Sequence, residues 1–85
     1  MTVDQNMPNP FKDNTVIGFN LAKGATVSLT LTDVNGKLIS KQEQFYNAGY
    51  NQIELSSDQI GTTGVVYYQL NSGNQTVTRK MIVLK

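Results

Sequence analysis

The acidic side chains are the first residues to consider for acid–base chemistry, and they are scattered along the 85-residue chain. They are Asp4, Asp13, Asp33, Glu43, Glu54 and Asp58. Hydrolysis of a glycosidic bond needs two carboxylates held across the bond, and the spacing of these six nominates no such pair. The chain contains no His and no Cys, so the commonest general base, the commonest metal ligand and the thiolate nucleophile are missing. Because Ser56 and Ser57 have no His or nearby Lys to activate them, we expect a protein that is not an enzyme and binds no cofactor or metal.

Asp33-x-Asn35-Gly36 is the motif that comes nearest to a metal site, since it matches the start of a calcium-binding loop. The remaining ligand positions and the terminal Glu of such a loop are absent. Asp side chains also bond nearby backbone amides in turns, and Asn-Gly tolerates positive φ. We therefore interpret the segment as a structural turn, a tight hairpin in which Asp33 and Gly36 are structural residues.

Tyrosines and asparagines offer a second kind of chemistry, because exposed aromatic rings of small β-sandwiches often bind sugars. The candidates are Tyr46, Tyr50, Tyr67, Tyr68, Asn51, Asn71 and Asn74. Adjacent residues of a strand point to opposite faces, so at least one of Tyr67 and Tyr68 belongs to the core. A carbohydrate-binding or adhesion accessory module of a secreted enzyme is therefore the alternative function.

Length and charge limit the remaining classes of function. Eighty-five residues make one domain at most, and a hydrophobic content of 39% argues against wholesale disorder. A net charge of +1 is too small for the clustered phosphate contacts of a nucleic-acid or anionic-membrane partner. There is no apolar run long enough to span a membrane, and residues 1–5 lack the features of a signal peptide. We expect a monomer that binds no nucleic acid and does not insert into a membrane.

The sequence pattern predicts that the elements positioning these residues are β-strands. Val, Ile, Thr, Tyr and Phe gather in short runs separated by Gly, Asn and Pro. Alternating patterns predict strands over residues 15–21, 27–32, 37–41, 50–55, 65–70 and 75–84, an edge strand or loop over 42–46, and one helical turn over 56–61. The strand over 65–70 is apolar on both faces and should be central. The predicted core consists of Ile17, Phe19, Leu21, Val27, Leu29, Leu31, Ile53, Leu55, Tyr68 and Leu70.

Six or seven short, mainly antiparallel strands without a helical period indicate an all-β fold, a small immunoglobulin-like β-sandwich. Residues 7–85 are expected to form this single module, and residues 1–6 to be a linker or an added remnant. Pro8 and Pro10 fix the backbone of a rigid entry that delivers Phe11 to the core.

The order of the short motifs resembles that of a known family. The chain reads Pro8-Asn9-Pro10-Phe11, an alternating strand, Asp33-Val34-Asn35-Gly36-Lys37, Ala48-Gly49-Tyr50-Asn51, Gly64-Val65-Val66-Tyr67-Tyr68 and Arg79-Lys80-Met81-Ile82-Val83-Leu84-Lys85. Each motif alone is weak, but in this order and at these separations they resemble the type A C-terminal sorting domain of type IX secretion system cargo proteins. The likeness covers nearly everything from Gln5 to Lys85.

The resemblance implies a non-catalytic β-sandwich appended to secreted enzymes and adhesins of Bacteroidetes-type bacteria. Such a domain directs its N-terminal cargo out of the periplasm and across the outer membrane. A sortase-like peptidase commonly removes it and can join the cargo to an anionic lipopolysaccharide. The implied partners are the type IX machinery, this peptidase and the cargo domain, and the implied location is secreted or on the cell surface.

The resemblance also implies roles for particular residues. Pro8, Asn9 and Pro10 correspond to the family's entry motif, and Asp33 and Gly36 to its D-x-x-G turn. The family's terminal signal strand corresponds to Lys80, Met81, Ile82, Val83, Leu84 and Lys85. One departure concerns the strand after Gly64, because the family commonly has an aromatic residue where this chain has Val66, and the bulk moves to Tyr67 and Tyr68.

The physical character of the terminal strand permits the same role. A strand with apolar residues on both faces can be recognised by strand addition, or through the cation and carboxylate of a terminal Lys85. The alternative is that Met81 to Leu84 is only a central core strand, and both interpretations can hold together.

Overall fold

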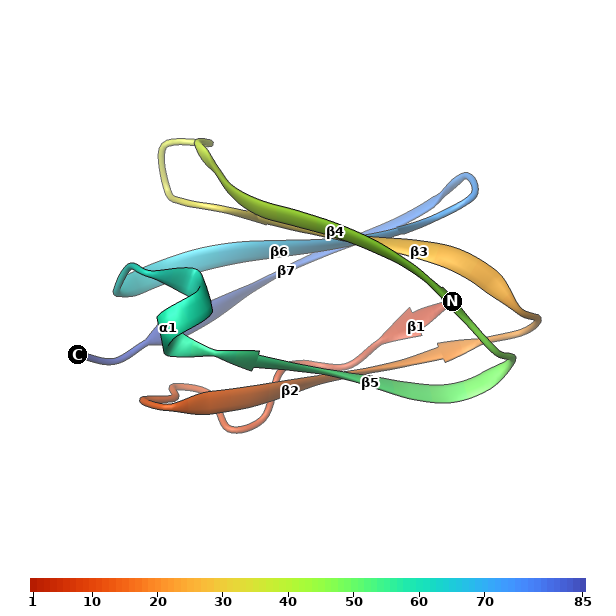
Figure 1. Ribbon diagram of the computed structural model, residues 1–85, viewed down its shortest axis with the longest axis horizontal. Coiled ribbons are helices and arrows are strands. Elements are labelled where there is room, and N and C mark those ends of the chain that lie inside the picture. Colours follow the sequence, from red (N-terminus) through yellow and green to blue (C-terminus); the bar gives the residue numbers. More distant parts are fainter.

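The computed structural model describes residues 1–85 and shows two antiparallel sheets packed face to face (Figure 1). The strands are β1 (Thr2–Val3), β2 (Asn14–Leu21), β3 (Ala25–Thr32), β4 (Leu38–Tyr46), β5 (Gly49–Ser56), β6 (Gly64–Ser72) and β7 (Gln75–Val83). A single helical turn, α1 (Ser57–Ile60), follows β5. One sheet has the order β1-β2-β5 and the other β4-β3-β6-β7. The predicted all-β sandwich is confirmed.

Period-2 alternation explains which side chains fill the space between the sheets. Val27, Leu29 and Leu31 of β3 point inward, while the Ser and Thr residues between them lie on the outer face. All ten residues predicted for the core are buried, and Val3, Phe11, Ile60, Val66, Met81 and Val83 join them. The central position predicted for residues 65–70 is also confirmed, since β6 lies between β3 and β7.

The structure decides the edge-strand alternative over 42–46 and corrects the predicted turn before it. The edge strand or loop expected over 42–46 is the second half of β4, so residues 38–46 are one strand. The turn before β4 is longer than the predicted two-residue hairpin, in which Asn35 and Gly36 would both have a positive φ. Only Gly36, at φ 82°, has one. Asp33 Oδ1 instead accepts hydrogen bonds from the N–H groups of Asn35 and Lys37, at 2.9 Å each. This carboxylate holds a longer loop closed.

The helical turn has caps at both ends, as the Ser56 to Gly61 segment predicts. The Ser56 hydroxyl accepts from the Gln59 N–H, and the Gln59 side chain accepts from the Ser56 N–H. Gly61 ends the turn in the left-handed conformation. Because Ile60 is buried, α1 closes the sandwich over the end of β5.

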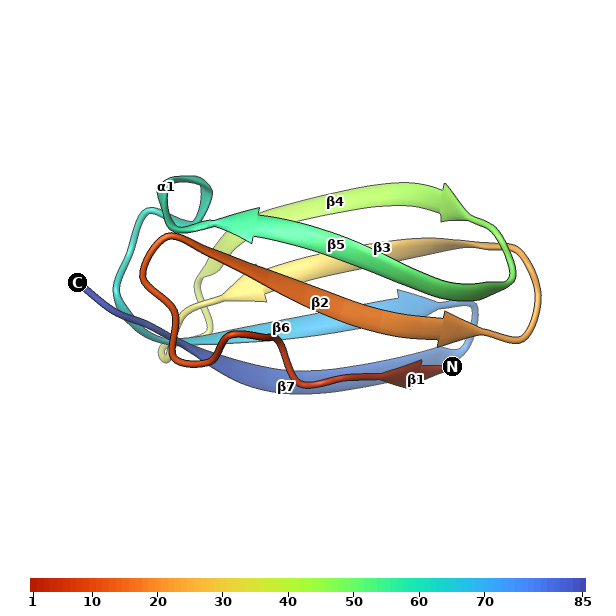
Figure 2. The same cartoon turned by 90° about the horizontal axis from the view of Figure 1, so that it is seen from below.

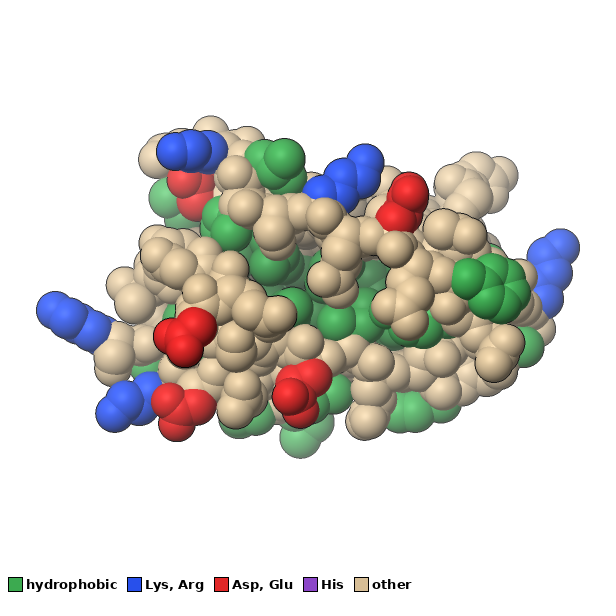
Figure 3. Space-filling model, viewed as in Figure 1, with side chains coloured by type: hydrophobic (Ala, Val, Ile, Leu, Met, Phe, Trp, Pro, Cys, Tyr) green, Lys and Arg blue, Asp and Glu red, His purple; other side chains and the backbone are tan.

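The two long margins of the sandwich are closed differently. On one margin, residues 3–11, which we call the entry segment, run between β2 and β7 (Figure 2). Val3, Asn6 and Phe11 of this segment are buried, so residues 2–6 pack against the sandwich. On the other margin, Figure 3 shows hydrophobic side chains between β4 and β5, with acidic and basic side chains dispersed around them. The chain therefore uses its own N-terminal residues to cover one margin.

Candidate functional site

The entry motif and the terminal strand, more than 70 residues apart in sequence, lie side by side. The Ile82 N–H donates to Asn9 Oδ1 at 2.9 Å. The Phe11 N–H donates to the Ile82 carbonyl at 3.1 Å, and the Leu84 N–H donates to the Phe11 carbonyl at 2.7 Å. Phe11 and Val83 thereby form an isolated parallel bridge. We call Asn9, Phe11, Ile82 and Leu84 with these three bonds the clasp.

The rest of the entry segment holds the clasp in place through a buried polar group. The Pro8 carbonyl accepts from the Thr15 hydroxyl at 2.9 Å and from the Asn6 side-chain amide at 3.2 Å. That amide also donates to Thr15 Oγ1 at 2.9 Å. Asn6 and Thr15 are fully buried, so their bonds are worth more than they would be in water. The backbone of Pro8 is therefore fixed directly before Asn9.

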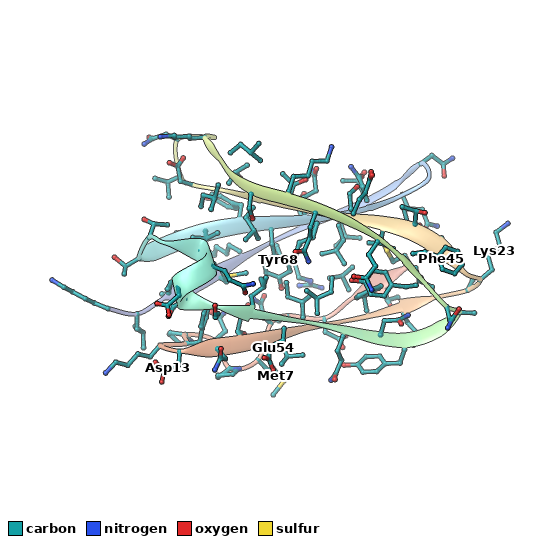
Figure 4. All side chains as sticks on the ribbon, in the orientation of Figure 1. Met7, Asp13, Lys23, Phe45, Glu54 and Tyr68 are labelled. Atoms are coloured by element: carbon teal, nitrogen blue, oxygen red, sulfur yellow. The ribbon has the colours of Figure 1, made fainter.

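Tyr68 connects the entry segment to the middle of the other sheet. Its ring is fully buried between the layers, and its hydroxyl accepts from the Asn6 N–H at 3.0 Å and donates to the Asp4 carbonyl at 3.1 Å (Figure 4). Burial raises the pKa of the Tyr68 phenol above its usual value, while the Asn6 N–H and the Arg79 charge oppose this shift. Val66 and Tyr68 both point inward and Tyr67 outward, which settles how the strand after Gly64 packs.

The terminal strand is an edge strand and not the central strand of the alternative interpretation. β7 pairs with β6 on one side and ends the sheet on the other. Met81 and Val83 are buried, with exposed fractions of 0% and 2%, whereas Ile82 and Leu84 are exposed at 37% and 47%. Lys80 and Lys85 are also exposed. The six predicted signal residues therefore divide into two that anchor the strand and four that face solvent.

The structural motif residues gather at the end of the sandwich where β7 ends. The Asp33 to Gly36 loop, α1 and the last residues of the chain lie at this end in both views (Figures 1 and 2). Gly64 pairs with Val83 across β6 and β7, and its φ of 93° suits a residue without a side chain. Pro8, Asn9 and Pro10 reach the same end through the clasp. All six predicted structural motif residues therefore lie at the same end of the sandwich as the signal strand.

A groove of about 450 Å³ opens beside the terminal residues at this end. Val83, Leu84 and Lys85 line it together with Lys12, Asp13, Ser57, Asp58, Gly61, Thr62 and Thr63. Two of these ten residues are hydrophobic, so the groove presents hydroxyl groups and charges of both signs. Asp13 and Glu54 lie on different parts of the molecule (Figure 4), and no three metal-ligating side chains of the chain form a group.

The residues considered for sugar binding are not brought to one face. Tyr68 is buried, and the Tyr46 ring packs edge-on against Phe19 with the ring centres 5.0 Å apart. Tyr50 and Tyr67 are exposed, but they lie on the outer faces of different sheets. Asn51 uses its side-chain amide to hold the Asn47 and Gly49 carbonyls. The structure therefore presents no paired aromatic platform.

Sequence reasoning missed the buried polar pair Asn6 and Thr15 and the strand β1. Nothing in the local pattern distinguishes Asn6 from an exposed turn residue, because its partners come from residues 8, 15 and 68. The clasp itself could have been suspected, since Asn9 lies between two prolines and has no local strand partner. No helix of the chain is long and apolar enough to cross a membrane.

Comparison with known proteins finds similarity to a protein family and to solved structures. A family model described as "Secretion system C-terminal sorting domain" matches residues 7–84. The chain is also similar in fold to the crystal structure of dimeric latent PorU from Porphyromonas gingivalis, with a TM-score of 0.69 and 20% sequence identity. That similarity covers 96% of this chain and 9% of the PorU chain. No curated protein matches the sequence.

Proposed function

The chain belongs to the family of secretion system C-terminal sorting domains, and we propose that it carries an attached cargo protein across the outer membrane by displaying its terminal strand. The family has a sorting role in type IX secretion, which makes the parent a secreted or cell-surface protein. In this proposal the sorting signal is Lys80, Met81, Ile82, Val83, Leu84 and Lys85. Pro8, Asn9, Pro10, Asp33, Gly36 and Gly64 hold the end of the sandwich that displays it.

The clasp is the observation that carries the proposal. It fixes the terminal strand to a rigid entry motif, so the strand stays extended although it lies at the edge of a sheet. Met81 and Val83 anchor the strand in the core, while Ile82 and Leu84 point to solvent. A receptor can therefore contact the outward side chains while the domain remains folded.

The same bonds limit how a receptor engages the last residues. Asn9 and Phe11 already occupy the main-chain groups on the free side of Ile82 and the Leu84 N–H. A partner strand cannot pair there unless the clasp opens. We therefore propose that the side chains of Lys80, Ile82, Leu84 and Lys85 are read directly, and that the groove beside Lys85 takes part in the contact.

The further partners follow from the family and belong to the proposal. The type IX machinery recognises the domain after the cargo has reached the periplasm, and a sortase-like peptidase then removes the domain. The domain itself contributes no catalytic group. Because most of residues 3–11 are hydrogen-bonded or buried, cleavage N-terminal to the entry segment would leave the fold of the domain intact.

The test is a secretion assay with a fluorescent cargo fused to residues 1–85 in a type IX-competent host. Deletion of Leu84 and Lys85 should retain the fusion in the cell envelope. Substitution of Ile82 and Leu84 by Ser should do the same without shortening the chain, because both side chains are exposed and surface changes usually alter stability by less than about 0.5 kcal/mol.

Matched controls lie at the opposite end of the molecule, where Lys23 and Phe45 are found (Figure 4). Phe45→Ser removes an apolar side chain that is more exposed than Ile82 or Leu84, and Lys23→Ala removes an exposed cation. Both control fusions should reach the medium at the intact rate, and circular dichroism should show that every variant is folded. If the folded Ile82→Ser, Leu84→Ser double variant is secreted as fast as the intact fusion, the assignment of the signal is wrong.

A further inference from the structure

β7 has a free side whose hydrogen bonds can be followed residue by residue. In an antiparallel pair, alternate residues direct their N–H and C=O groups toward the partner strand, and the others direct them away from it. Ile82 bonds to Asn9 and Phe11 through both groups, so the even-numbered residues of β7 point away from β6. The Lys80 carbonyl agrees with this pattern, because the Gln5 side-chain amide donates to it at 2.8 Å.

The pattern leaves the first half of the free side unpaired. The N–H and C=O groups of Thr76 and Thr78 and the N–H of Lys80 point outward and have no partner within the chain. The side chains of all three residues are exposed. Figure 2 shows this part of β7 along the margin of the molecule. Beside β7 there is therefore a fifth strand position of this sheet. Residues 9–11 fill it at one end, the Gln5 side chain reaches it at the Lys80 carbonyl, and no main-chain group fills it from Thr76 to the Lys80 N–H.

The charge around the open position is mainly positive. Arg79 and Lys80 are exposed at its end, and neither β6 nor β7 contains an Asp or Glu. The Arg79 guanidinium donates to the Val3 carbonyl at 2.9 Å, which holds its charge beside the entry segment. The edge strands β4 and β5 differ, because they carry Glu43 and Glu54. Asp4 is the acidic residue near this region, since its charge raises the pKa of the Tyr68 phenol.

We propose that the open edge of β7 from Thr76 to Lys80 binds an extended, acidic segment of a partner protein by strand addition. The main-chain groups of Thr76 and Thr78 would supply the pairing, and Lys80 on the outer face would select carboxylate side chains, while Arg79 adds positive charge from the opposite face. The clasp stops the added strand at Lys80, since residues 9–11 already occupy the position beyond it. This surface shares only Lys80 with the sorting signal and needs no secretion machinery to be observed.

The probe is a short, blocked peptide of alternating Glu and Val, added to the purified domain. Hydrogen exchange followed by NMR should show slower exchange of the Thr76 and Thr78 amides when the peptide is present, with no change at Ser28 or Thr30 on the interior strand β3. A peptide of alternating Lys and Val should bind at least about tenfold more weakly, a difference of about 1.4 kcal/mol. Added salt should weaken the binding of the Glu peptide.

The matched variants are Thr78→Pro and Thr78→Ala. Proline removes the outward N–H and is tolerated at an edge strand where that group faces solvent, so Thr78→Pro should abolish peptide binding. Thr78→Ala keeps the N–H and should bind as the intact domain does. Thermal unfolding should show that both variants are folded, and Lys80→Gln serves as a charge variant if Thr78→Pro does not fold.

Several outcomes would overturn the proposal. They are equal binding of the Glu and Lys peptides, intact binding by folded Thr78→Pro, or protection of amides other than those of residues 76–80. Concentration-dependent protection of Thr78 without peptide would identify a second copy of the chain as the occupant. A negative result here leaves the secretion assay unaffected, because that assay tests Ile82 and Leu84.

Discussion

A few side chains between the two sheets determine whether the entry segment stays attached. Tyr68, Asn6 and Thr15 are fully buried, and every buried side-chain polar atom has a hydrogen-bond partner. A buried polar group that loses its partner costs about 1–3 kcal/mol. For a domain this small, one such loss is a large part of the total stability.

Tyr68 gives a prediction about pH. Burial raises the pKa of its phenol above 10.0, so the neutral form stabilises the fold fully below the unfolded-state pKa, and this contribution is lost as the pH rises through the folded-state value. The free energy of unfolding should therefore decrease as the pH rises above about 10. In Tyr68→Phe this decrease should be smaller, although stability at neutral pH falls because the Asn6 N–H loses its acceptor.

Urea unfolding at neutral and alkaline pH measures both effects. Tyr50→Phe is the control, because the Tyr50 side chain is exposed. An alkaline decrease of the same size in Tyr68→Phe and in the intact domain would contradict the assignment.

Asn9 gives a prediction about the clasp. Asn9→Ala removes the acceptor of the Ile82 N–H and should cost about 0.5–1.5 kcal/mol, the net worth of an ordinary hydrogen bond. The Ile82 amide should exchange faster with solvent, while the Met81 amide, which faces β6, should not. Hydrogen exchange by NMR measures both amides, and Asn74→Ala in the β6–β7 turn is the control. Unchanged exchange at Ile82 would mean that Asn9 does not hold the strand in solution.

At the scale of elements, the Asp33 to Gly36 loop sets the geometry between β3 and β4. Gly36 has a φ of 82°, and left-handed geometry costs an L-residue about 1–2 kcal/mol. Gly36→Val should therefore lower the free energy of unfolding by at least this amount. Asn35→Val is the control, since Asn35 has no positive φ, and urea unfolding compares the two.

The same loop tests the calcium alternative. Asp33 Oδ1 accepts hydrogen bonds from two backbone N–H groups, so its lone pairs are already used within the turn. Calorimetric titration with calcium should give no saturable heat. Saturable heat of micromolar affinity would identify a metal site instead.

Most of the strands could be predicted from sequence because they carry their own period. β3 alternates Val27, Leu29 and Leu31 with hydroxyl residues, and no other element is needed to see which face is buried. The position of a strand within a sheet cannot be predicted from its period in the same way. β7 has apolar residues on both faces, a pattern that fits a central strand, yet it lies at an edge with Ile82 exposed.

The candidate site was only partly predictable for a similar reason. The resemblance placed the signal on Lys80 to Lys85 and the entry motif on Pro8 to Pro10, but the bonds between them join residues about as far apart as the chain allows. Local periodicity contains no information about such contacts. The same holds for β1, whose two residues are too few to show a period.

At the scale of the whole molecule, the entry segment is part of the fold. Deletion of residues 1–6 exposes the site of Val3, whose burial contributes about 1.5–3 kcal/mol, and removes both partners of the Tyr68 hydroxyl. We expect a markedly lower midpoint of urea unfolding with retained strand content. Thr2→Ala is the control, because Thr2 is exposed. A deletion that leaves the midpoint unchanged would show that residues 1–6 do not contribute to stability.

The clasp also determines how the domain responds to tension. The N-terminus and the last residues lie toward opposite ends of the long axis (Figure 1), and the entry segment runs back along that axis to meet β7. A cargo pulled in one direction and a receptor holding Lys85 in the other would slide the two parallel segments past each other. The three clasp bonds would then be sheared together and would not unzip in turn. Traction during export would thus be transmitted from cargo to terminal strand through residues 9–11, while most of the sandwich carries little of it.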